Sequence, residues 1–430
     1  MNRLKGMKLL ILGASPDEIT LVKRAQEFGI YVIVTDYNTD RKLSPAKDIA
    51  DEAWDISWSE IDDLEKKCKE TGVNGVIAGY SEFRVENTIK LTKRLGLPCY
   101  CTEEQLDITR DKIKFKNECR KNNVPVIKEY KTVDEVDNFP VIVKPVDRAG
   151  SIGISVAENK EELQKSYDYA MEMSICKEVI IEDYINNATK FDSYYVIIDG
   201  EIQLISTDDV MMSPKNGYER VVQNGWILPS IHQGAYIEKV DDSLKTMIRN
   251  MGIKNGYIFF SGFADKNDNF VFFECGFRLC GGNLYNYFPK IGMCNTLDLF
   301  IMHSLLGKVD LPKLNIDLRT KLKCVTLNYY ANKGVITQIN GFNEVAKMKN
   351  CYFAMTKCHI GQQCNNDKAI LSKIGMVYFC SESDDELIED IKNANELISV
   401  LDENGECMIY DKVSVNNIHS LKEVLNVNYC

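Results

Sequence analysis

A short apolar segment, Val141-Ile-Val-Lys-Pro145, runs into the polar, glycine-containing loop Val146-Asp-Arg-Ala-Gly-Ser-Ile-Gly153. The first five residues form an apolar strand, and Ile154-Ser-Val156 is the strand that returns after the loop. A solvated lysine is poorly placed in such a strand. If Lys144 instead points into a cleft, its ammonium is a compact positive charge suited to phosphate oxygens.

The loop itself is small and rich in glycine. Gly150 and Gly153 leave no side chain between the backbone amides and a phosphate group. The loop matches neither a Walker loop nor a dinucleotide loop, and an ordinary hairpin turn is the alternative. Lys112, at the start of the preceding helix, can supply a second positive charge or can be a surface lysine.

An extended segment follows the next helix, which spans Lys160 to Met173. Val179-Ile-Ile-Glu182 is a strand that continues into Asp183-Tyr-Ile185. Extended backbone of this kind offers donors and acceptors to the edge of an adenine ring.

A second group of charged residues lies at Phe272-Phe-Glu-Cys-Gly-Phe-Arg-Leu-Cys-Gly-Gly282. Glu274 and Arg278 stand at the end of an apolar strand, where burying both charges without a partner would cost several kcal/mol. A structural salt bridge is one explanation. The functional explanation places Glu274 on magnesium, and Arg278 beside the charge that develops in phosphoryl transfer or in a tetrahedral intermediate.

The N-terminal region alternates strands and helices, which predicts a parallel sheet in a domain ending near residue 107. Lys8–Leu12 and Tyr31–Thr35 are strands on either side of a helix. Asp36 follows the second strand, where a nucleotide-binding unit often holds a ribose-binding acid. Because the turn Gly13-Ala-Ser-Pro16 lacks the GxGxxG fingerprint, a scaffold without cofactor is favoured over a dinucleotide site.

Composition excludes several classes of protein. The 430 residues carry 52 Lys+Arg against 63 Asp+Glu, a net charge of −11 that argues against broad nucleic-acid or anionic-membrane binding. No apolar run is long enough for a membrane span and the start lacks a signal-peptide layout, so we expect a soluble, cytoplasmic protein. The 15 cysteines are best explained as reduced thiols; the only candidate metal cluster is Cys351, Cys358, His359 and Cys364.

Taken in order, these segments resemble the ATP-grasp superfamily over about residues 1 to 310. The matching elements are Asp111-Lys112, the VIVKP strand, the AGSIG loop, VIIEDYI and ECGFRLCGG. The resemblance implies an α/β protein with three parts: a parallel-sheet domain over 1–107, a two-subdomain ATP-grasp α+β fold over 108–310, and a C-terminal α+β domain over 311–430. The phosphate-loop lid would span about residues 125–185.

The resemblance also implies roles for individual residues. Lys112 and Lys144 match the two ATP-phosphate lysines, and Ala149, Gly150, Ser151 and Gly153 belong to the flexible phosphate loop. Glu182, Asp183, Tyr184 and Ile185 fall where the family holds adenine. Glu274 matches a ligand of Mg²⁺, and Arg278 matches the catalytic arginine.

Three positions depart from the family pattern. Gly276 replaces an asparagine that is usually a metal ligand, and Ser261 stands where a second metal carboxylate is expected, with Asp265 the nearest acid. Lys190 occupies the region of a ribose-binding glutamate, with Asp192 two residues further on.

The resemblance implies an ATP- and Mg²⁺-dependent carboxylate–amine ligase of the amino-acid or peptide type, which acts through an acyl phosphate. Its partners would be small carboxylate and amine substrates, and family members are often homodimers. His232, Tyr285 and Tyr287 could line an acceptor pocket or belong to the core. The alternatives are a catalytically lapsed ATP-binding sensor or scaffold, and a carboxylase-like or purine-pathway enzyme; a nicotinamide dehydrogenase is least favoured.

Overall fold

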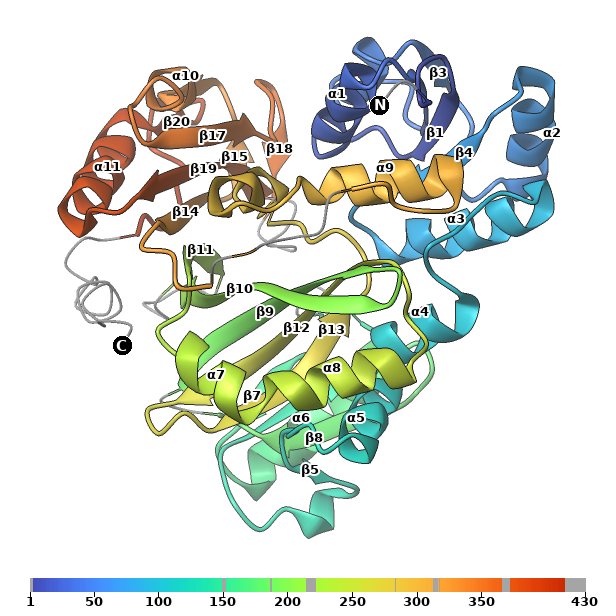
Figure 1. Cartoon of the computed structure of the whole chain (residues 1–430). Coiled ribbons are helices and arrows are strands. Elements are labelled where there is room, and N and C mark those ends of the chain that lie inside the picture. Colours follow the sequence, from blue (N-terminus) through green and yellow to red (C-terminus); the bar gives the residue numbers. More distant parts are fainter. Residues whose placement is uncertain are drawn as a thin grey trace.

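The computed structural model describes residues 3–148, 152–185, 188–213, 222–282, 284–311, 316, 318–365 and 372–413. Its N-terminal part, blue in Figure 1, contains a four-stranded sheet in the order β3-β2-β1-β4. All three strand pairs are parallel, as the sequence predicts. The strands are β1 (Lys8–Leu12), β2 (Tyr31–Thr35), β3 (Glu52–Trp54) and β4 (Gly75–Ala78); the helices are α1 (Glu18–Glu27), η1 (Pro45–Asp48), α2 (Ile61–Thr71) and α3 (Glu82–Leu95).

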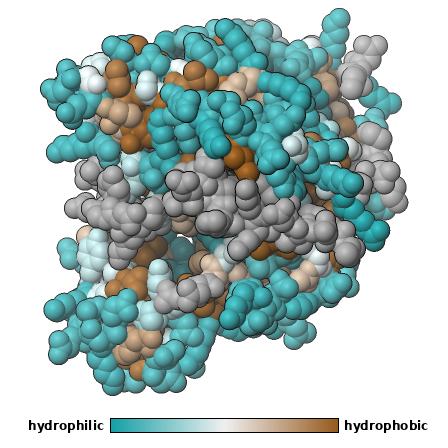
Figure 2. All heavy atoms as spheres, turned by 90° about the vertical axis from the view of Figure 1, so that its left-hand side faces the viewer, coloured by the Kyte–Doolittle hydropathy of each residue, from teal (hydrophilic) through white to brown (hydrophobic). Residues whose placement is uncertain are grey.

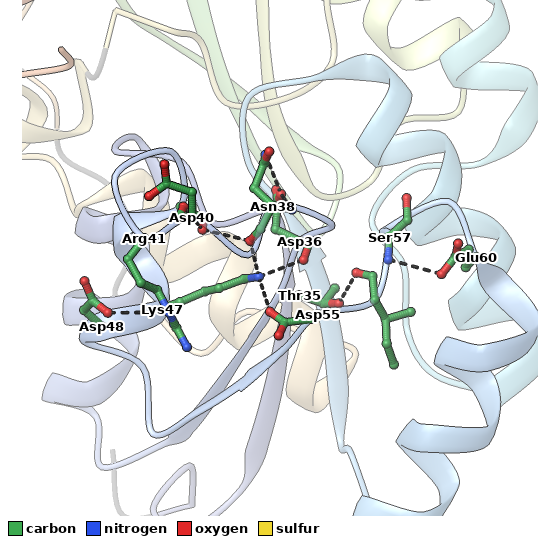
Figure 3. A network of polar contacts seen from close by, with 12 residues as sticks. Thr35, Asp36, Asn38, Asp40, Arg41, Lys47, Asp48, Asp55, Ser57 and Glu60 are labelled. Carbon is green, nitrogen blue, oxygen red and sulfur yellow. Dashed lines mark hydrogen bonds and ion pairs between the residues drawn. The ribbon is translucent and has the colours of Figure 1, made fainter. Parts of the chain in front are cut away.

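The loop after β2 is held by polar contacts (Figure 3). Asp36 Oδ1 accepts hydrogen bonds from both the backbone N–H and the side-chain amide of Asn38, each at 2.9 Å. The buried Lys47 ammonium donates to the carbonyl oxygens of Asp36 and Asn38 and pairs with Asp55 at 2.7 Å. Asp36 and Lys47 therefore hold the loop after β2 in place.

Two short helices lead into a second, smaller sheet. The side chains of Thr102 and Gln105 form a capping box at the start of α4 (Glu103–Arg110), and Asp111 caps α5 (Lys112–Lys121). The sheet has the order β5-β8-β6-β7, and α6 packs on it (Figure 1). Its elements are β5 (Glu129–Tyr130), η2 (Val133–Glu135), β6 (Val141–Pro145), β7 (Ser155–Ala157), α6 (Lys160–Met173) and β8 (Val179–Asp183).

An eight-stranded sheet forms the centre of the molecule, in the order β13-β12-β9-β10-β11-β14-β19-β17. One of its faces packs against α7 and α8 (Figure 1). The elements are β9 (Ala188–Ile198), β10 (Glu201–Met212), β11 (Gln223–Leu228), α7 (Gln233–Lys239), α8 (Asp241–Asn250), β12 (Gly256–Asp265), β13 (Phe270–Gly276), β14 (Lys323–Tyr330), β17 (Cys351–Thr356) and β19 (Lys373–Ser381).

The C-terminal strands extend the central sheet, because β14 pairs with β11 in an antiparallel register. The domain boundary near residue 310 stays a prediction, since this sheet runs across it.

Helix α9 (Thr296–Leu306) packs against both β4 and β12, and Arg24 of α1 pairs with Asp298 of α9 at 2.6 Å. The remaining elements are η3 (Leu284–Asn286), η4 (Phe288–Ile291), β15 (Gly334–Val335), β16 (Gln338–Asn340), α10 (Phe342–Val345), β18 (Gln363–Cys364), α11 (Asp384–Leu397) and β20 (Ser399–Leu401).

The face shown in Figure 2 is mostly hydrophilic, and its hydrophobic residues lie in small separate groups. No helix in the described ranges has the length and apolar character required to span a membrane. All cysteines in these ranges are free thiols.

Candidate nucleotide site

Two buried lysines share one carboxylate between α5 and the smaller sheet. Lys144 of β6 lies 2.5 Å from Glu182 Oε2 of β8, and Lys116 of α5 also contacts Glu182. The side chains of Lys116 and Glu182 have no exposed area, and that of Lys144 is only 8% exposed. Lys116 pairs in addition with Glu129 of β5 at 2.9 Å. The three strands and the helix therefore place two ammonium groups side by side.

This cluster carries an excess of positive charge. Arg120 joins it through Glu129, and the charges of Lys112 and Glu274 also act on Lys144, so four cations stand against the three carboxylates of Glu129, Glu182 and Glu274. Burial, and then the positive charges of Lys116 and Lys112, lower the pKa of Lys144 to about 7. The single negative charge of Glu182 is shared between Lys116 and Lys144, so Glu182 cannot fully restore the pKa of Lys144. A bound polyanion would relieve the repulsion and favour the charged form of each lysine.

Lys116 was missed by the sequence analysis, which selected Lys112 on the same helix. The Lys112 ammonium donates to the carbonyl oxygens of Val146 at 3.2 Å and Arg148 at 3.0 Å. It therefore holds the start of the loop. The spacing of four residues between the two lysines, which places both on one helix face, was the available signal for Lys116. Ala149, Gly150 and Ser151 lie outside the described residues.

The residues of the predicted adenine segment, Glu182 to Ile185, make different contacts in the structure. Glu182 is the carboxylate that the two lysines share. Asp183 Oδ1 accepts a hydrogen bond from the Tyr130 hydroxyl at 2.7 Å, and the Asp183 and Tyr184 N–H groups donate to Lys128 and Pro140. Tyr184 is 40% exposed. Adenine binding by Asp183, Tyr184 and Ile185 stays a prediction, and the Asp183 side chain is already engaged.

The lysine cluster faces the edge of the central sheet. The Phe273 ring of β13 lies 5.8 Å from the ammonium of Lys144 and 5.8 Å from that of Lys190 on β9. Phe263 of β12 contacts the same ring at 5.2 Å. The neighbouring Glu274 is half-buried and its negative charge raises the pKa of Lys144. Glu274 lies opposite Ser261, which is on the same face of β12 as Phe263. An aromatic surface, cations and a carboxylate therefore meet between the two sheets.

Arg278 lies beyond the end of β13 and reaches the N-terminal part of the chain. Its Nε pairs with Glu82 of α3 at 2.6 Å, and its Nη1 donates to Leu279 O at 2.9 Å. The guanidinium also stacks over the Phe259 ring at 5.4 Å. Its side chain keeps 17% of its area exposed, so the group is fixed in place yet remains accessible.

The space at Gly276 is taken by an aromatic ring. A Cβ atom built on this glycine would lie 2.4 Å from Cζ of Phe259. An asparagine in the family's position therefore does not fit unless Phe259 moves. The missing amide ligand is explained by this packing between adjacent strands.

Replacing Gly276 with Asn is expected to lower the free energy of unfolding by about 1–3 kcal/mol, because the core must shift to admit the new side chain. Chemical denaturation measures the change. Gly234→Ala is the matched control: its position in α7 has no atom within 4 Å of an added Cβ, so its stability should stay the same or rise slightly. Equal stability of Gly276→Asn and wild type would contradict the packing explanation.

Other candidates from the sequence have structural roles. The Asp265 carboxylate accepts hydrogen bonds from Asn267 and Asn269 within the β12–β13 turn, so it does not replace the missing metal ligand at position 261. His232 is buried and its Nδ1 lies 2.6 Å from Asp268. Tyr285 and Tyr287 are buried in the core, and the Tyr285 hydroxyl is hydrogen-bonded to Tyr80 at 3.1 Å.

Within the described ranges, no three His, Cys, Asp or Glu side chains lie close enough together to hold a metal ion. The cluster of Cys351, Cys358, His359 and Cys364 is therefore not a metal site. A magnesium site needs fewer protein ligands than such a cluster would supply. Mg²⁺ usually takes one or two protein carboxylates and completes its shell with phosphate oxygens and water, and the half-buried Glu274 meets that requirement.

Comparison with known proteins connects this arrangement to a known fold. Residues 107–218 match the family model "D-ala D-ala ligase C-terminus", which covers the lysine pair and the adenine segment. The chain is 30% identical over 190 residues to a formate-dependent phosphoribosylglycinamide formyltransferase of Nostoc sp., over 42% of this chain and 48% of that protein. It thus spans about half the length of that relative.

Two solved structures match nearly the whole chain. The biotin carboxylase domain of Hydrogenobacter thermophilus 2-oxoglutarate carboxylase, in complex with MgADP, ADP and bicarbonate, has a TM-score of 0.76 at 15% identity, covering 98% of this chain and 99% of that one. The L-amino acid ligase of Bacillus licheniformis has a TM-score of 0.72 at 16% identity, covering 93% and 100%. At these identities the two structures show the fold: the chain has the ATP-grasp type of α/β fold over nearly its whole length.

Proposed function

We propose that this chain is an ATP- and Mg²⁺-dependent ligase that joins a small carboxylate to an amine through an acyl phosphate. The observation that carries the proposal is the buried pair of Lys116 and Lys144 on the single carboxylate of Glu182. Glu182 is shared by the two lysines, and the other carboxylate on Lys116, that of Glu129, is shared with Arg120, so the buried cations are not fully neutralised and are costly unless an anion binds beside them. The phosphate groups of ATP supply that anion, and the Phe273 ring offers an apolar surface next to it.

The proposed chemistry uses residues from both sheets. A carboxylate oxygen of the substrate attacks the γ-phosphorus, the bond to the ADP oxygen breaks, and an acyl phosphate forms. The amine then attacks the acyl carbon, loses a proton, and displaces phosphate. Lys144 would hold phosphate oxygens during the first step, while Arg278 would stabilise the negative charge that grows in both. Magnesium, when bound at Glu274, would neutralise charge on the phosphate oxygens.

Two structural neighbours suggest different substrates. The L-amino acid ligase supports an amino-acid carboxylate and an amine, whereas the carboxylase domain, solved with bicarbonate, supports bicarbonate as the group that attacks the γ-phosphorus in the first step. A catalytically lapsed nucleotide sensor is the third possibility, favoured by the packing of Phe259 on Gly276, which leaves no room for an asparagine ligand. These alternatives differ in whether ADP is released and in which substrate triggers the release.

The direct test is ADP and phosphate release from ATP–Mg²⁺ with pools of carboxylates, with hydroxylamine as the trapping nucleophile. The ligase predicts release with one pool and the matching hydroxamate as product. Bicarbonate-dependent release without hydroxamate would favour the carboxylase reaction. If ATP binds but no pool triggers ADP release, the sensor is favoured and the ligase is contradicted.

The lowered pKa of Lys144 predicts a pH dependence of nucleotide binding. Above pH 7 part of the free protein holds this lysine neutral, and bound phosphate raises its pKa again. At about pH 8.5 we therefore expect uptake of close to one proton per ATP bound, and weaker affinity than at about pH 6.5. Calorimetry in buffers of different ionisation enthalpy measures the uptake. Lys144→Arg should remove it, because arginine stays protonated at both pH values; equal uptake by the variant would contradict the assignment.

A further inference from the structure

Three side chains form a row across adjacent strands of the central sheet. Ser261 of β12 lies directly opposite Glu274 of β13 on one side and Asp192 of β9 on the other. Directly opposed residues point to the same face of a sheet, and neighbouring strands are about 4.8 Å apart. Asp192 is therefore on the same face as Glu274, separated from it by a single strand. We call these residues the Asp192–Ser261–Glu274 row.

Asp192 is a buried acid with an unused oxygen. It is 8% exposed, and its Oδ1 has no hydrogen-bond partner within the described ranges. The Ser261 side chain is hydrogen-bonded to its carboxylate, and the charge of Lys190 acts on it. A carboxylate oxygen that is buried without a partner costs free energy, so a bound group is expected to complete its contacts.

The row also explains why position 261 can be a serine. A carboxylate at 261 would lie between Asp192 and Glu274 and crowd three negative charges together. With serine in the middle, the hydroxyl supports Asp192 and leaves two carboxylates on the face that holds Lys144 and Phe273. Two carboxylates are the number that Mg²⁺ commonly takes from a protein when phosphates supply other ligands.

We propose that Asp192 is the second carboxylate of the magnesium site, acting with Glu274 and supported by Ser261. The inference rests on the proposed function, because ATP phosphates would complete the metal's shell.

A neighbouring acid provides the matched control. Asp208 of β10 lies directly opposite Asp192, one strand further from Glu274. It is fully buried, and the Tyr194 hydroxyl lies 2.5 Å from its Oδ2. Its Oδ1 is buried without a hydrogen-bond partner in the described ranges, as that of Asp192 is, but two strands separate Asp208 from Glu274 where only one separates Asp192. Asp208→Asn is therefore expected to leave metal binding unchanged.

The test measures ATP affinity by equilibrium dialysis, first in EDTA and then across a series of Mg²⁺ concentrations. The factor by which saturating Mg²⁺ tightens ATP binding is the readout. We expect Asp192→Asn to reduce this factor about tenfold or more, with affinity in EDTA close to wild type. The electron paramagnetic resonance signal of protein-bound Mn²⁺, measured in the presence of ATP, should be weaker in Asp192→Asn than in the wild type.

A second pair of variants moves the acid from position 192 to position 261, so that the test does not depend on the stability of one variant. Asp192→Ser should lose the Mg²⁺ effect, and adding Ser261→Asp should restore most of it, because the new acid occupies the same row. An unchanged Mg²⁺ factor in Asp192→Asn, or no recovery in the folded double variant, would overturn the inference. Failure of the proposed function is distinguishable: a wild type that binds ATP more tightly with Mg²⁺ but releases no ADP would contradict the ligase and leave the metal site intact, whereas a wild type that binds no ATP in EDTA or in Mg²⁺ would contradict the nucleotide site itself.

Discussion

Replacing Lys144 with Met is expected to weaken ATP binding about 10- to 100-fold, the effect of losing a hydrogen bond to a charged group worth about 1.5–3 kcal/mol. Methionine keeps most of the apolar stem, and Glu182 retains its contact with Lys116. The folded state should therefore survive the change. Equilibrium binding of ATP–Mg²⁺, combined with thermal denaturation, measures both properties.

Lys128→Met is the control for Lys144→Met. Lys128 precedes the same small sheet, its side chain is 53% exposed, and it pairs with Asp137 at 2.9 Å. Because an exposed pair contributes little, ATP affinity and stability should stay near wild type. If Lys144→Met bound ATP as tightly as Lys128→Met, the lysine cluster would not be the phosphate site.

Replacing Arg278 with Ala is expected to lower turnover about 100- to 1000-fold while ATP still binds, as found when one donor to a developing negative charge is removed. The partner Glu82 keeps 36% of its side chain exposed, so it can be solvated once the arginine is gone. Activity assays with the substrate identified by hydroxamate trapping, together with ATP binding, separate the two effects.

Glu82→Gln tests whether Arg278 acts directly or only through its link to α3. This variant removes the charge partner and keeps the arginine, its stacking on Phe259 and its hydrogen bond to Leu279. A direct role predicts a much smaller loss of turnover than in Arg278→Ala. Equal losses in the two variants would instead make the ion pair between α3 and the loop the important feature.

Local sequence patterns predicted several of the strands. Apolar runs predicted β1 and β2 of the N-terminal sheet, because the burial of a short strand is decided over a few residues, but they did not predict the three-residue strand β3. Gly72 and Gly96 end α2 and α3 in the left-handed conformation that glycine adopts readily. The same local signal placed Lys144 in its strand and Glu274 at the end of another.

The features that were missed depend on contacts between distant parts of the chain. Asp192 and Ser261 are 69 positions apart and become neighbours only through the register of β9 and β12. Phe259 closes the space at Gly276 by packing between strands β12 and β13. Neither register nor packing is visible in a single sequence, so the departures from the family pattern could be noticed but not explained.

The most direct test of the account is the fate of the carboxylate oxygen. With the substrate identified by trapping and labelled with ¹⁸O in its carboxylate, each turnover with the natural amine should transfer one ¹⁸O atom to the released phosphate. This transfer follows because the substrate oxygen that attacks the γ-phosphorus leaves with phosphate when the amine displaces it. Unlabelled phosphate, released in step with product, would contradict an acyl-phosphate mechanism.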